Sequence, residues 1–191
     1  MERNPLNSQG YKLESQIREA FGRVTYTQTC HEKLKKKLLK INDDLKTWQI
    51  VFLAMLTGSF AAAFISIEKL SAIIAALSSF GLLILNTYAK NSGLVEKAQK
   101  HQQASDLLRR IRKEYVSLLT DFETLAPEQI MEKRDELQER TAKIYLNLPG
   151  INYTQAKKVL KTEEVKSFSE EEIDIMLPDA IRRCTRTKDS V

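Results

Sequence analysis

Hydrophobic and polar positions divide this chain into an apolar centre between two amphipathic arms. The centre holds two stretches without a charged residue, Thr47 to Ile67 and Leu70 to Ala89, separated by Glu68 and Lys69. About 20 residues of α-helix rise about 30 Å, which is the thickness of a bilayer's hydrocarbon core. Each stretch is therefore long enough to cross a membrane once. The pattern predicts a transmembrane helical hairpin with spans 47–67 and 70–89 and a turn at 68–69.

A buried hairpin inside a soluble helical protein is the alternative for two apolar helices. The remaining sequence would then have to cover both helices on all sides. That sequence is polar and amphipathic, so each of its helices offers one apolar stripe rather than a surrounding core. The membrane hairpin is the better prediction.

Both arms show helical periodicity. In the N-terminal arm, apolar residues alternate at spacings of three and four, as in a heptad seam. No proline interrupts the chain between Tyr11 and Ile67, so one helix of about 50 residues is expected. The C-terminal arm repeats the spacing from Leu108 to Leu125, and Gly93 is a place where it can bend.

Folding the chain at 68–69 brings the two arms side by side as an antiparallel stalk. Leu34 is then expected near Gln103, and Val24 near Lys113. Thr27 and His31 are polar positions in the seam. We interpret them as packing or register positions in preference to a pH-sensitive element.

A further helical region is expected after Ala126. Pro127 followed by Glu128 is typical of a first helical turn, and Leu148-Pro149-Gly150 ends that helix. Thr154 is a candidate cap for a short basic helix. Ser169 and Glu172 form a capping box for a last helix, which Pro178 breaks or kinks.

The predicted fold is therefore an all-α membrane protein with four regions. They are an N-terminal cytoplasmic amphipathic helix (1–46), the transmembrane hairpin (47–89), a cytoplasmic return helix (90–126) and a C-terminal helical extension (127–191).

The distribution of charge predicts the topology. The chain has 30 Lys and Arg against 25 Asp and Glu, a net charge of +5, and most of the excess flanks the apolar stretches while the turn holds only Lys69. Basic residues favour the cytoplasmic side, which places both termini in the cytoplasm. The expected anchors at the membrane interface are Trp48, Tyr88, Lys46 and Lys90. Anionic lipid headgroups account for the basic excess, and no aromatic residues are interleaved with it, so no direct nucleic-acid binding is expected.

The sequence contains no recognised motif for catalysis or for metal binding. There is no phosphate-binding glycine loop, HExxH, CxxC or nucleophile elbow, and we expect neither an enzyme nor a cofactor. Cys30 and Cys184 are the only cysteines and are expected to be free thiols in a reducing compartment. Cys30-His31 lacks the paired spacing of a zinc site, and His101 stands alone, so no metal is expected.

Small and weakly polar residues mark one side of each apolar stretch. The first has a helix-packing stripe of Ala54, Gly58, Ala62 and Ser66, and the second has Ser71, Ala75, Ser78 and Asn86 on a broadly common side. Small stripes let membrane helices approach closely. One interpretation is that the second set faces a water-filled pore when several hairpins assemble. The other is that both sets pack the two helices of one chain together, with hydroxyls bonded back to their own helix.

Several segments resemble the SLATT family of two-helix membrane effectors. They are residues 13–26 (LESQIREAFGRVTY), the hairpin, residues 83–88 (LILNTY), residues 134–138 (RDELQ) and residues 169–174 (SEEEID). The resemblance covers nearly the whole chain and fits the subgroup with a long helical C-terminal extension. It implies a bacterial anti-phage or conflict system in which a membrane effector acts in the plasma (inner) membrane. Implied partners are a sensor, a nucleotide second-messenger synthase or a reverse transcriptase.

Two functions from different classes follow. The first is an effector that assembles as a homo-oligomer in the lipid bilayer and forms a pore or disrupts the membrane when a cytoplasmic partner or nucleotide signal triggers it. The second is a passive anchor or scaffold that docks a cytoplasmic partner through its stalk. A small transporter subunit is disfavoured because neither apolar stretch contains a charged residue.

Overall fold

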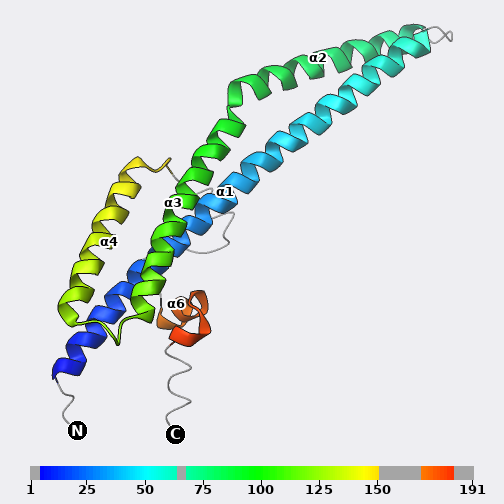
Figure 1. Cartoon of the computed structure of the whole chain (residues 1–191). Coiled ribbons are helices and arrows are strands. Elements are labelled where there is room, and N and C mark those ends of the chain that lie inside the picture. Colours follow the sequence, from blue (N-terminus) through cyan, green and yellow to red (C-terminus); the bar gives the residue numbers. More distant parts are fainter. Residues whose placement is uncertain (1–4, 64–67, 151–168, 183–191) are drawn as a thin grey trace. The chain divides into compact units, whose positions relative to one another are not determined.

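The computed structural model describes residues 5–63, 68–150 and 169–182. Regular structure in these ranges is entirely helical, as the sequence predicted. Figure 1 shows the elements in chain order. They are α1 (Pro5–Ala63), α2 (Glu68–Ser92), α3 (Leu94–Thr120), α4 (Pro127–Asn147), α6 (Glu170–Met176) and the 3-10 helix η1 (Asp179–Ile181). The predicted cap Thr154, the stripe residue Ser66 and Cys184 lie outside the described residues.

The two arms differ in how their helices are interrupted. α1 runs for 59 residues without a break, which confirms the long first helix. On the return path, Gly93 has a φ of +57°, a left-handed conformation that L side chains adopt at a cost. This residue separates α2 from α3, and the Gly93 carbonyl accepts the Lys97 N–H at 3.0 Å to begin the next helix. The sequence had allowed for a bend here, and the structure shows two helices.

The helix starts predicted at Pro127 and at Ser169 are confirmed. α4 begins at Pro127, and the side chain of Gln129 accepts the Ala126 N–H at 3.2 Å. α6 begins with the expected capping box: the Glu172 N–H donates to Ser169 Oγ at 3.2 Å, and the Ser169 N–H donates to Glu172 Oε2 at 3.0 Å. Pro178 follows the end of this helix.

The chain forms two compact units, which we call the core unit (residues 1–34 and 101–191) and the apolar unit (residues 35–100). In the core unit, α1 and α3 run antiparallel, and Ser105 of α3 lies opposite Glu32 of α1 as the predicted register requires. Buried side chains from α1, α3, α4, α6 and η1 make one hydrophobic core. Its members are Ile17, Phe21, Val24, Leu108, Ile111, Tyr115, Leu118, Leu119, Ile130, Leu137, Ile173, Leu177 and Ile181.

Candidate functional site

The apolar unit carries large hydrophobic side chains on its surface. The helical stretch Lys69–Thr120 includes a window that is long and apolar enough to cross a membrane, and only 11% of that window is buried. A core helix of a soluble protein would be mostly buried, so this surface needs an apolar partner or medium. The exposed large hydrophobic residues of the unit are Trp48, Ile50, Val51, Leu53, Met55, Phe60, Leu70, Ile73, Leu77, Phe80, Leu83, Ile84, Tyr88 and Val95.

This window coincides with the second predicted span. It is the one membrane-capable stretch among the described residues. The first predicted span includes residues 64–67, which are not described, so the structure does not establish a second crossing. Glu68 and Lys69, the predicted turn, are the first two residues of α2.

α1 and α2 approach closely at Gly81, a position that the small-residue pattern did not single out. A Cβ atom added at Gly81 would lie 2.8 Å from Cε1 of Phe52 on α1. Nearer the ends of the apolar stretches, Gln49 Nε2 donates to Asn86 Oδ1 at 3.0 Å. The two helices are therefore held by a ring packed on a glycine and by a side-chain hydrogen bond, which are typical contacts of membrane helix pairs.

The structure divides the predicted pore-facing set. Ser71 and Ser78 are buried within the unit, and Ala75 is half-buried. Asn86 is exposed apart from its bond with Gln49. In the single chain, the two serines are therefore covered, and Asn86 is the member of the set at the surface.

The predicted packing stripe is exposed where the structure describes it. Ala54 and Gly58 are exposed, and a Cβ atom built at Gly58 has no described neighbour from outside its own helical turn within 4 Å. The side chain of Ala62 and the whole of Ser66 lie outside the described residues. Ala54 and Gly58 therefore lie at the surface of the part of the chain that the structure describes. The predicted anchors Lys46, Trp48, Tyr88 and Lys90 are also exposed, and the Trp48 ring lies 6.3 Å from the ring of Phe52.

We expect Ser78→Ala to raise the stability of the hairpin by about 1 kcal/mol, because the buried Oγ of Ser78 has no hydrogen-bond partner among the described residues. Thermal unfolding in detergent micelles measures the change. Ser59→Ala is the matched control: Ser59 is also buried, but its Oγ donates to the Met55 carbonyl at 2.7 Å. A loss of stability from Ser78→Ala would contradict the expectation.

A buried arginine holds the C-terminal helices of the core unit against α1. Arg18 is only 2% exposed and forms an ion pair with the buried carboxylate of Asp174 on α6. Arg18 Nη1 also donates to the Ile181 carbonyl at 3.1 Å. Arg182 Nε donates to the carbonyls of Asp174, at 2.7 Å, and Leu177, at 2.9 Å. We call residues 169–182 with these contacts the C-terminal clasp.

Two histidines meet where α1 and α3 pair in the core unit. His31 is fully buried, and its Nδ1 lies 2.8 Å from Nδ1 of His101. Burial, and secondarily His101, lowers the pKa of His31 to about 4, and burial lowers the pKa of His101. The sequence analysis placed His31 in the seam but left His101 without a partner. The sequence did hold a signal that His101 faces α1: this residue lies one heptad before Leu108, which belongs to the seam.

The carboxylate of Glu32, next to His31 in the sequence, already accepts hydrogen bonds from other residues. Glu32 Oε1 accepts hydrogen bonds from Arg109 at 2.6 Å, Gln28 at 3.2 Å and Ser105 at 3.3 Å. The Arg109 bond is the largest cause of the lowered pKa of Glu32. Burial raises the pKa of Cys30, which keeps this buried thiol protonated. In the described ranges, no cluster of three or more His, Cys, Asp or Glu side chains is placed to hold a metal ion.

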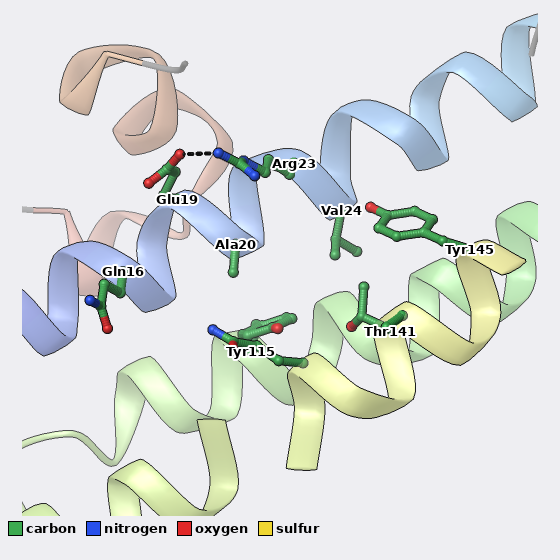
Figure 2. A pocket seen from close by; sticks show the side chains of 10 residues that line it. Gln16, Glu19, Ala20, Arg23, Val24, Tyr115, Thr141 and Tyr145 are labelled. Atoms are coloured by element: carbon green, nitrogen blue, oxygen red, sulfur yellow. Dashed lines mark hydrogen bonds and ion pairs between the residues drawn. The ribbon is translucent and has the colours of Figure 1, made fainter. Parts of the chain in front are cut away.

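An open groove of about 370 Å³ lies where α1, α3 and α4 meet in the core unit. Figure 2 shows Ala20, Val24, Tyr115 and Thr141 around it, with the Glu19–Arg23 ion pair at its edge. The groove is a mixed surface of small apolar and hydrogen-bonding side chains. Of the buried polar atoms that lack a partner in the described part of the chain, none belongs to a groove residue, so the geometry indicates no particular ligand class.

These features define a class of protein: a chain whose described structure is helical and which joins a packed helical unit to an exposed, membrane-type apolar helix. Residues 13–172 match the model of a protein family described as SMODS and SLOG-associating 2TM effector domain family 4, and the chain belongs to this family. The match confirms the resemblance to the SLATT family. No curated protein and no solved structure matches the chain. The family is one of membrane-type effector domains of conflict systems, and its description names no enzymatic activity.

Proposed function

We propose that this chain is a two-pass effector of a bacterial conflict system that resides in the plasma membrane. The observation that carries the proposal is the exposed apolar surface of the apolar unit, in a chain of a 2TM effector family. The hairpin spans residues 47–67 and 70–89. Residues 1–46, 90–126 and 127–191 lie in the cytoplasm, because basic residues flank the hairpin on the side of the termini.

Assembly of several hairpins produces the activity in this proposal. A two-helix protein lines a channel only as a multimer, and the exposed face at Ala54 and Gly58 offers a surface for close contact with a second copy. The Gln49–Asn86 pair then supplies polar groups to the pore or membrane defect. A cytoplasmic sensor, second-messenger synthase or reverse transcriptase acts on the core unit and triggers assembly. It does so by raising the population of the open, assembled state of the hairpins.

Membrane potential in a bacterial host tests this proposal. We expect expression of the chain to depolarise cells that carry a voltage-sensitive dye, and a Gln49→Leu, Asn86→Leu double variant to reach the membrane without depolarising it. Thr87→Val is the matched control, because Thr87 is exposed nearby but its hydroxyl donates to its own helix, to the Leu83 carbonyl at 2.8 Å. This control should depolarise like the original.

The same experiment separates an effector from a passive anchor. If neither the chain alone nor the chain with its genomic neighbours changes the potential, the effector proposal fails. A passive anchor would also keep its function when the hairpin is replaced by an unrelated transmembrane hairpin, whereas a pore-forming effector would lose it.

A further inference from the structure

We propose that His31 and His101 form a proton-sensitive latch between α1 and α3 of the core unit. The latch is closed while the two rings share one Nδ1 proton, and it opens when both rings become cationic. This inference goes beyond the effector function and does not rest on it, because all the atoms involved belong to the core unit.

The geometry requires one proton between the two rings. The Nδ1 atoms lie 2.8 Å apart, with ring centroids 5.1 Å apart. At this distance one Nδ1 must carry a hydrogen and donate it, and the other must accept with its lone pair. Two neutral rings satisfy this arrangement, and so does one cation beside one neutral ring.

The two histidines differ in how readily each accepts a further proton. His31 is fully buried, and its Nε2 has no hydrogen-bond partner among the described residues. His101 is only half-buried. A first added proton therefore goes to Nε2 of His101, whose Nδ1–H continues to donate to His31. A second proton must occupy the accepting Nδ1 of His31, which places two donors face to face and a charge in the core.

Charged groups around the pair do not favour the cationic form. On α1, the carboxylate of Glu32 is held by Arg109, Gln28 and Ser105, and Cys30 is a buried neutral thiol. On α3, Asp106 accepts from Gln102 at 2.7 Å. The side chains one helical turn from the pair in sequence include the cations Lys35 and Lys97.

The sign of the pH effect follows from these surroundings. A histidine whose pKa is lowered in the folded state contributes stability that is complete above its ordinary pKa of 6.5 and is lost as the pH falls toward about 4. At pH 5, opening that exposes His31 to water is favoured about 30-fold relative to pH 7.5. α1 continues from His31 to Ala63, so the helix that the latch holds also includes residues 47–63 of the first apolar stretch.

Hydrogen exchange of the full chain in lipid nanodiscs tests the latch. We expect protection of the amides in residues 24–34 and 104–111 to fall about 30-fold between pH 7.5 and pH 5, after correction for the intrinsic exchange rate. The double variant His31→Leu, His101→Leu should show no such fall. Amides of α4, which contains no histidine, should change much less and serve as the internal reference.

Histidine NMR gives a second readout that does not depend on the variant folding. The chain contains two histidines, so their ring signals are assigned by one single substitution. We expect His31 to remain neutral to below pH 5 while His101 takes up the first proton. Independent titration of both rings near pH 6.5 would overturn the proposal, as would equal pH dependence of exchange in the original and the folded double variant.

Discussion

Asp174→Ala is expected to lower the free energy of unfolding of the core unit by about 3–5 kcal/mol and to release the C-terminal clasp from α1. The substitution removes the buried carboxylate from the Arg18 guanidinium, which is 2% exposed, and leaves the longer contact of Arg18 Nη1 with Glu14 Oε1 at 3.4 Å. Removing one partner of a buried ion pair is among the most costly changes a core can suffer. Urea denaturation of the chain in micelles measures the loss, and limited proteolysis after residue 150 reports the release.

A compensating double variant distinguishes the lost charge pair from lost packing. Arg18→Met with Asp174→Leu removes both charges and restores apolar volume, so we expect it to be markedly more stable than Asp174→Ala alone. Glu19→Ala is the surface control: its Arg23 partner is 62% exposed, and the pair should contribute less than about 1 kcal/mol. A double variant as unstable as the single one would mean that the ion pair is not what holds the clasp.

Gly58→Leu should abolish depolarisation of the host while leaving insertion and the stability of the single hairpin unchanged. A Cβ atom built at Gly58 meets no neighbouring side chain within 4 Å among the described residues, so we expect the added leucine to interfere with a second molecule. Chemical cross-linking in membranes should show fewer oligomers.

Gly81→Leu is the matched substitution at a packed glycine of the same unit. Its side chain collides with the Phe52 ring, so this variant should unfold at a lower temperature in micelles. If Gly58→Leu depolarises cells like the original, the exposed stripe has no part in assembly. If Gly58→Leu instead destabilises the isolated hairpin as Gly81→Leu does, the stripe packs within one chain.

Local sequence signals were sufficient for some helix ends, although α3 ends at Thr120 and not after Leu125 as the heptad spacing had predicted. The absence of proline predicted one long first helix, Pro127 predicted the start of α4, and Ser169 with Glu172 predicted the start of α6. These features depend on backbone donors, acceptors and ring geometry within a few residues. Such interactions are readable from a short window of sequence.

Side-chain partners across helices were less predictable. Periodicity shows which residues share a face, but it does not show which neighbour that face meets. Ser78 and Gly58 both belonged to predicted faces, yet one is buried and the other is exposed. The partner of Arg18 lies at the far end of the chain, on a helix of seven residues whose docking no local pattern encodes. To predict the contact of His31 with His101, one would likewise have to know how each helix is rotated about its axis.

The left-handed residue Gly93 ends the angular count of α2 within the apolar unit. In an uninterrupted helix each residue advances the chain by about 100°, so one inserted residue turns all later side chains by that angle relative to the earlier ones. An insertion between Gly81 and Asn86 would therefore prevent α2 from keeping both its Phe52 and its Gln49 contact on α1. An insertion beside Gly93 leaves the angular relation between these two contacts intact.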